Sequence, residues 1–314
     1  MPASPQPPET PKPADKRIFW NEIQANKRKS YLLVAIVVVV LFALVWVFAE
    51  IFSGLGSGIV TFFTLLFVAA YSYVTYYHCD EIVIAATGAK PLDTSNPAGR
   101  HLQNLVEGLA IAAGVPVPRV YVVDSPEMNA FATGRDPKHA VVAVTTGLWS
   151  RLSRQELEGV IGHEMSHVRN YDIRFATLVA VMVGVVAILS DILLHYYRFG
   201  GGRGNSDRKG SGGVLLIIIG LVLAIFAPII VRFVQAAVSR KRELLADASA
   251  VQLTRYPEGL ASALEKIGGA NKGNMQVNEA VSHLFFVDPV KSSLDDLTAT
   301  HPPIEERVKL LRSM

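Results

Sequence analysis

The stretch His163-Glu164-Met165-Ser166-His167 decides how the rest of this sequence is interpreted. Residues four apart on an α-helix lie about 40° apart around the axis, one turn above the other. His163 and His167 can therefore share one zinc ion, while Glu164 stands beside the ion as a general base. The stretch predicts a zinc site of the hydrolytic type.

The flanking sequence also predicts a helix at this place. Ser153-Arg154-Gln155-Glu156 fits a capping box, in which the serine accepts from the first turn and the glutamate reaches back. Apolar residues recur along a neighbouring face and can pack against a core: Leu157, Val160, Ile161, Met165 and Val168. The helix therefore combines a packing face with an edge that carries the histidines.

A third zinc ligand is expected from another segment, because catalytic zinc sites have three protein ligands. The best candidate is Glu243, in a helical stretch that follows the last apolar run. Asp247 lies one turn further on the same face and can accept the N–H of a ligand histidine, which fixes its tautomer. A solvated surface with balanced charges would explain these two residues taken alone. The need for a third ligand favours the metal site.

The composition indicates a membrane protein. Half of the 314 residues are hydrophobic and the mean hydropathy is +0.32, which is too apolar for an ordinary soluble chain of this size. Four apolar runs are candidates for membrane helices: 31–49, 59–77, 175–197 and 214–231. The net charge of +3 gives no field strong enough to imply a nucleic-acid partner. The single cysteine excludes an internal disulfide.

The distribution of charges predicts the orientation in the membrane. Residues 1–30 end in a basic cluster, whereas the turn at 50–58 has no lysine or arginine. The positive-inside rule then places the N-terminus, and the chain after the first hairpin, in the cytoplasm. His163 precedes the third run and Glu243 follows the fourth. Because both residues must reach the same metal ion, they lie on the same side of the membrane, so either both runs cross it or neither does. Their lengths favour crossing, whereas the basic residues at 198–209 favour a cytoplasmic loop.

Between the two pairs of apolar runs the sequence predicts a small unit of helix and sheet. One helix and three strands are expected there: Pro97–Ala113, Arg119–Asp124, Ala130–Gly134 and Ala140–Thr146. Ala140–Thr146 comes shortly before the histidine helix. We expect it to be the sheet edge to which an extended substrate adds as a strand, with Val142 and Val144 in contact with the substrate.

The expected fold class is α+β and mainly α. It is a multi-pass membrane protein whose zincin-like catalytic domain, an active-site helix beside a small sheet, is interrupted by a transmembrane hairpin. The chain divides into a disordered tail (1–30), a first transmembrane hairpin (31–79), the first part of the catalytic domain (80–174), a second membrane hairpin with a Gly-rich loop (175–234) and the second part of the catalytic domain (235–314).

The combined pattern resembles the HtpX family of membrane zinc peptidases, which is related to the CAAX prenyl proteases. The resemblance is carried by His163–His167, a hydrophobic hairpin, and then Arg240-Lys241-Arg242-Glu243-Leu244-Leu245-Ala246-Asp247. Two further segments match: Asn129–Gly134, and Thr300-His301-Pro302-Pro303 followed by Arg307. The resemblance covers nearly everything from residue 31 onward, and only the Pro-rich tail and the Gly-rich loop depart from it.

The resemblance implies a zinc-dependent endopeptidase that hydrolyses membrane proteins at the cytoplasmic face of the cell (inner) membrane, in quality control and stress response. It implies one Zn2+ per chain on His163, His167 and Glu243, with Glu164 as the general base. His301 matches a family histidine that could stabilise the tetrahedral intermediate, and Asn129 is expected to contact substrate. Expected partners are membrane-protein or unfolded polypeptide substrates and the lipid bilayer, with self-cleavage as a further reaction and no nucleic acid.

Two other functions stay open at this point. An intramembrane protease would need the histidine helix inside an apolar span, but charged residues flank it: Arg151, Arg154, Glu156, Glu158, Arg169 and Asp172. A non-catalytic scaffold with structural zinc would be expected to have a fourth protein ligand, and Glu164 would have no role in it. The sequence favours a hydrolytic site beside the membrane.

Overall fold

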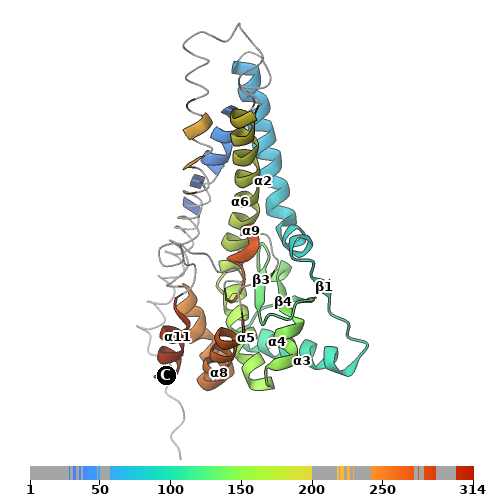
Figure 1. Cartoon of the computed structure of the whole chain (residues 1–314). Coiled ribbons are helices and arrows are strands. Elements are labelled where there is room, and N and C mark those ends of the chain that lie inside the picture. Colours follow the sequence, from blue (N-terminus) through green and yellow to red (C-terminus); the bar gives the residue numbers. More distant parts are fainter. Residues whose placement is uncertain are drawn as a thin grey trace, which may run out of the picture.

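The computed structural model describes residues 57–199, 242–271, 275, 279–287 and 302–314, with scattered residues between 28 and 49 and between 218 and 229. Two long helices, α2 (Ser57–Thr87) and α6 (Asp172–Phe199), run side by side away from a unit of short helices around a sheet (Figure 1). The described part is mainly helical with one small mixed sheet, as predicted.

The sheet has four strands in the order β1-β2-β4-β3. Their bounds are β1 (Lys90–Pro91), β2 (Arg119–Val123), β4 (Val141–Thr145) and β3 (Ala130–Thr133). β2 and β4 are parallel, with Val120 opposite Val142, whereas β3 pairs with β4 in the antiparallel direction. β3 is therefore an edge strand, and β4 is an inner one.

The prediction that Ala140–Thr146 forms the edge of the sheet is wrong. Its residues form β4, between β2 and β3, and all five β4 residues are buried. Val142 and Val144 pack in the hydrophobic core and do not face a substrate. The physical reason is that β4 pairs with β2 on one side and with β3 on the other, and no local pattern within a strand determines which strands it meets.

Alternating side chains of the sheet face two different cores. Val142 and Val144 face a core shared with α3 (Pro97–Ala113), α5 (Arg154–Arg169) and α8 (Pro257–Ala270). Phe131 and Ala143 face a second cluster, to which the end of α2 contributes Val83 and α6 contributes Ala180. The sheet is thus placed between the site-bearing helix α5 and the base of the long helix pair.

Two predicted helix boundaries are confirmed. α3 begins after Asn96, whose side chain accepts from the Gly99 N–H, and ends at Gly114 with a φ of 68° that suits glycine. α5 begins at the predicted capping box: the Ser153 hydroxyl accepts from the Glu156 N–H, and the Glu156 carboxylate accepts from the Ser153 N–H. A short helix, α4 (Thr146–Arg151), lies between β4 and α5.

The membrane segments are described in part. Among the described residues, Gly58–Thr87 is the one helix long and apolar enough to cross a membrane, and Val38–Val47 is a shorter apolar helix. α2 continues past the expected hairpin end at residue 79, with a non-helical residue at His78. The tail 1–30, apart from residue 28, and most of 200–241 lie outside the described residues, so crossing by the second hairpin stays a prediction.

Candidate metal centre

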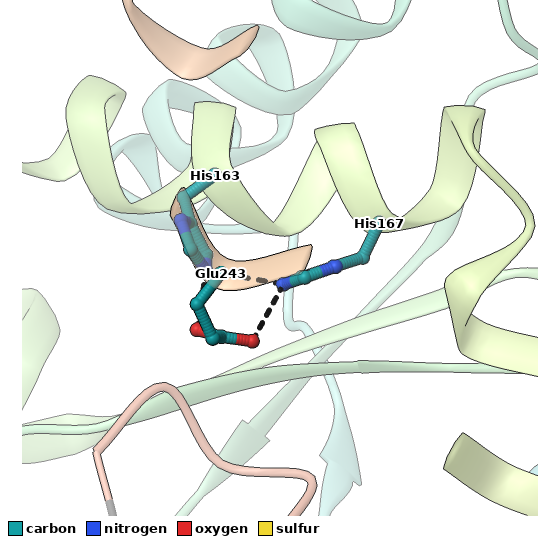
Figure 2. Close-up of side chains that lie close together, drawn as sticks. All are labelled: His163, His167 and Glu243. Atoms are coloured by element: carbon teal, nitrogen blue, oxygen red, sulfur yellow. Dashed lines mark hydrogen bonds and ion pairs between the residues drawn. The ribbon is translucent and has the colours of Figure 1, made fainter. Parts of the chain in front are cut away.

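The predicted ligands His163, His167 and Glu243 lie together. Both histidines belong to α5, and Glu243 lies in the helix formed by residues 242–254. Figure 2 shows the two imidazoles leaving α5 toward the Glu243 carboxylate. The candidate ligand atoms all lie within 4.8 Å of one another. The third candidate ligand, although distant in the sequence, therefore lies beside the histidine helix.

The spacing of these atoms fits one zinc ion. The two Nε2 atoms are 3.1 Å apart. The Glu243 oxygens lie 3.4 Å from His163 Nε2 and 3.4 Å from His167 Nε2. Two ligand atoms at about 2.05 Å from a tetrahedral zinc ion would lie about 3.3 Å apart. Among the described residues the cluster has three ligands, which is the number typical of a catalytic zinc site.

A carboxylate stands behind each histidine. Asp247 Oδ1 lies 2.8 Å from His163 Nδ1, which confirms the predicted pairing. Asp172, at the start of α6, lies 3.2 Å from His167 Nδ1. A carboxylate at Nδ1 holds the proton on that nitrogen and leaves Nε2 as the ligand atom. The sequence does not predict this contact of Asp172. Asp172 lies beyond the end of α5, and the turn at Tyr171, with a φ of 62°, places its side chain beside His167.

Arg307 is a site residue for which the sequence predicted no role. It lies in α11 (Ile304–Leu311) and is 1% exposed. Its Nε and Nη2 donate to both Asp247 oxygens, at 2.8 and 2.7 Å. Its guanidinium lies over the ring of Phe286, 4.7 Å from the centroid. In the sequence, Arg307 belongs to a segment that matches the HtpX family, but no role follows from that match. No local pattern predicts its contact with Asp247, which lies 60 residues away.

The site carries an excess of buried negative charge. Four buried carboxyl groups and two buried guanidinium groups surround the histidines: Glu164, Asp172, Glu243, Asp247, Arg242 and Arg307. With neutral histidines, two more negative than positive charges remain. A divalent cation would compensate them, because buried charges need a partner.

The pKa values of these groups follow from the same arrangement. Burial disfavours a charged His167, but Asp172 and Glu243 outweigh burial and raise its pKa to about 10. Burial also opposes charge on His163, whose pKa is still raised by its bonds to Asp247 and Glu243. Burial would raise the pKa of Asp247, but Arg307 and His163 lower it to about 2. The site therefore stabilises positive charge at the histidines, and a metal ion would take the place of protons.

Glu164, the predicted general base, lies beside the ligands, and its catalytic role stays a prediction. It is 2% exposed and lines a cavity together with all three ligands. His301, the other predicted catalytic residue, lies outside the described residues. Asn129 is buried, and its side chain contacts the backbone of Val287; its contact with substrate stays a prediction.

Fold and site together define the class as a membrane metalloprotease. The sequence profile of peptidase family M48 matches residues 98–314. The chain therefore belongs to peptidase family M48.

Relatives named "Protease HtpX homolog" are similar over nearly the whole chain. One from Caldanaerobacter subterraneus subsp. tengcongensis is 44% identical, covering 95% of this chain and 99% of its own. One from Dictyoglomus thermophilum is 43% identical, covering 94% and 95%. One from Streptococcus thermophilus is 40% identical, covering 95% and 100%. The predicted resemblance to the HtpX family is confirmed.

One solved structure is similar in fold. The crystal structure of S. mikatae Ste24p gives a TM-score of 0.50 at 18% identity, covering 92% of this chain and 66% of that chain. At this identity the similarity supports the fold alone.

Proposed function

We propose that the protein is a zinc-dependent endopeptidase that hydrolyses membrane proteins at the cytoplasmic face of the membrane, in membrane-protein quality control. The observation that carries this proposal is the spacing of His163, His167 and Glu243, which fits one zinc ion with Glu164 beside it. A three-ligand site leaves a position for water and substrate, whereas a structural zinc site is closed by a fourth ligand.

The chain's own groups supply the proton transfers of the reaction. A zinc ion held by His163, His167 and Glu243 would supply a Lewis acid for the attacking water and the scissile carbonyl. Glu164 accepts a proton from the attacking water and then donates it to the nitrogen of the cleaved peptide bond. Asp247 and Asp172 keep the Nδ1 protons of the histidines in place while this happens. His301 is proposed as a further donor to the developing oxyanion.

The position of the site supports substrates that lie at a membrane. α6 begins only five residues after His167, and its first residue, Asp172, contacts that histidine. The site therefore lies at the base of the long helix pair (Figure 1). Loops, tails and unfolded segments of membrane proteins, including other copies of this chain, would meet it there. The cytoplasmic orientation rests on the positive-inside rule.

The variant Glu164→Gln tests the catalytic role. It should retain one zinc per chain, because Glu164 is not a ligand, and hydrolyse casein about 10²–10⁴ times more slowly. Purified protein in detergent would be assayed for zinc content and for casein hydrolysis, before and after chelation and zinc readdition. Glu158→Gln is the matched control, because Glu158 lies on the same helix and pairs with the exposed Arg154.

Two results would contradict the proposal. If Glu164→Gln hydrolysed casein as fast as the unchanged protein, Glu164 would not be the base. If the unchanged protein held zinc and hydrolysed no polypeptide, the scaffold interpretation would replace the peptidase.

A further inference from the structure

A short segment of the chain lies along the outer edge of β3, beside the metal centre. It follows α9 (Glu279–Ser282) and consists of residues 283–287, which we call the edge segment. The Phe286 N–H donates to the Ala130 carbonyl at 2.8 Å. Phe285 pairs with Phe131 in an isolated antiparallel bridge. The edge segment thus pairs with the outer edge of β3, where a fifth strand would lie.

Asn129 extends this pairing by one residue. Its Nδ2 donates to the Val287 carbonyl at 2.6 Å, and its Oδ1 accepts from the Val287 N–H at 3.1 Å. A side-chain amide that binds both backbone groups of one residue imitates a rung of a β-ladder. Three successive residues, Asn129 to Phe131, therefore hold the edge segment.

The side chains of the edge segment pack on both faces of the sheet. The ring of Phe285 lies 4.9 Å from the ring of Phe131, among residues of α2 and α6. The ring of Phe286 lies 4.9 Å from the ring of His163, on the side of the metal centre. A ring nitrogen of His283 lies 3.3 Å from the Ala176 carbonyl of α6. The edge segment therefore joins the metal centre to the base of the long helices.

Between the described residues, the space at the metal centre is too small for a polypeptide. The cavity lined by the ligands, Glu164 and the edge segment has a volume of about 70 Å³, whereas ligand pockets usually measure about 300–1,000 Å³. His163 is 1% exposed and Glu164 is 2% exposed. An extended substrate could add to β3 only by using the backbone groups that the edge segment now holds.

We propose that the edge segment is a displaceable cover, which keeps the enzyme latent until a substrate strand replaces it on β3. The proposal rests on the proposed peptidase function. Displacement requires few backbone bonds to break, because the pairing is an isolated bridge and not a continuous strand. Hydrolysis is then limited by release of the edge segment, so holding it in place stops the enzyme and loosening it speeds the enzyme up.

A reversible disulfide between the edge segment and β3 tests the expectation that holding the edge segment in place stops hydrolysis. Phe131 and Phe285 are directly opposite each other, and Cα atoms in such pairs lie about 4.5–5.5 Å apart, within disulfide range. The double variant Phe131→Cys/Phe285→Cys, made with Cys79→Ala, would be assayed on casein in oxidised and reduced form. We expect the oxidised form to be at least tenfold slower and reduction to restore the rate. Equal rates would overturn the proposal.

Because both forms are one protein, loss of the two phenyl rings affects them equally. The Cys79→Ala protein with and without reductant controls for effects of the reductant on zinc. If no form and no control hydrolysed casein, the peptidase function would fail. If all hydrolysed it at one rate, that function would stand and only the cover would fail.

A loosening variant gives an independent test. Leu284 is buried in the cluster at the base of the long helices, and Leu284→Ala should raise the initial rate of casein hydrolysis severalfold. The matched control is Leu264→Ala, a buried leucine of α8 outside that cluster, which should not raise the rate. A Leu284→Ala protein no faster than the Leu264→Ala protein would count against the cover.

Discussion

Each histidine of the candidate metal centre is positioned by a carboxylate that is not one of the three candidate ligands. Arg307 keeps Asp247 ionised, and Asp247 holds His163 through Nδ1. The same arrangement recurs with Asp172 behind His167. Because a ligand imidazole must have its Nε2 free of a proton and aimed at the metal, we expect these buried pairs to determine how tightly the proposed zinc ion binds.

The variant Asp247→Asn should weaken zinc binding by about 10–100-fold, because the amide cannot replace the charge behind His163. Competition with a chelator of known zinc affinity would measure this. Glu265→Gln is the control, since Glu265 is half-exposed and pairs with Arg312 away from the site. Unchanged affinity in Asp247→Asn would show that Asp247 does not support the ligand.

At the scale of elements, the close approach of α5 and α8 positions the histidine helix. Gly159 of α5 faces the backbone of α8, and a Cβ there would lie 2.7 Å from the Leu260 nitrogen. Such a contact forces the helices apart, because the neighbouring atom is backbone and cannot turn aside. The absence of a side chain at Gly159 therefore sets the distance between these helices.

Gly159→Ala should destabilise the fold by about 1–3 kcal/mol through overpacking. Gly108→Ala on α3 is the matched control. A Cβ at Gly108 would meet nothing within 4 Å, and alanine should stabilise that helix by up to about 1 kcal/mol. Thermal unfolding of both variants in the same detergent would check this, and equal shifts would refute the close-contact argument.

The start of α5 should make stability depend on pH. Burial would raise the pKa of Glu156, but Lys266, Ser262 and the capping contacts lower it from 4.5 to about 2. A lowered pKa means that the carboxylate stabilises the fold above about pH 4.5, and that this contribution is lost as the pH falls toward 2. The half-exposed Lys266 limits the effect to about 1–2 kcal/mol.

Glu156→Gln should therefore lower the melting temperature at pH 7, and the difference from the unchanged protein should shrink as the pH falls below 4.5. Melting curves across this range would measure it. A difference that stays constant down to the lowest accessible pH would mean that the charge of Glu156 contributes nothing.

Local signals made several elements predictable, and long-range pairing made others unpredictable. The capping box at Ser153 and the stop at Gly114 depend on neighbours within a few residues. The order of strands in the sheet depends on which strands meet in space, and the sequence alone does not show this. For that reason the sequence predicts β4 at the edge of the sheet, whereas the edge strand is β3. The ligand set followed from helical spacing and the number of ligands zinc needs. The roles of Arg307 and of the edge segment could not be predicted, because their contacts join residues far apart in the sequence. Arg307 contacts His163 across 144 residues, and Val287 contacts Asn129 across 158 residues.

For the whole molecule, the length of α6 relates the metal centre to the membrane. The helix has 28 residues, which corresponds to about 42 Å at 1.5 Å per residue and exceeds a hydrocarbon core of about 30 Å. α6 also packs beside α2, with the Tyr71 hydroxyl donating to the Val181 carbonyl at 3.1 Å. By length alone α6 could cross a membrane; that the chain after α6 reaches the opposite side stays a prediction, because Gly58–Thr87 is the one described helix that is both long and apolar enough.

Single cysteines placed in a Cys79→Ala protein would test this topology. Ser206→Cys, beyond α6, and Gly108→Cys, exposed on α3 in the unit that holds the site, should be labelled by an impermeant reagent from opposite sides of sealed vesicles. Labelling of both cysteines from the same side would mean that neither of the apolar runs 175–197 and 214–231 crosses the membrane.

The distance along the chain between His163 and Arg307 also has a consequence in time. A ribosome adding about 5–20 residues per second needs about 7–30 s to make the 144 residues that separate them. During that interval the histidines have been synthesised, but the arginine that supports Asp247 has not. We therefore expect a newly made chain to be inactive as a peptidase until its C-terminal part has folded. Ribosome-stalled chains of increasing length should gain hydrolysis only once Arg307 has emerged.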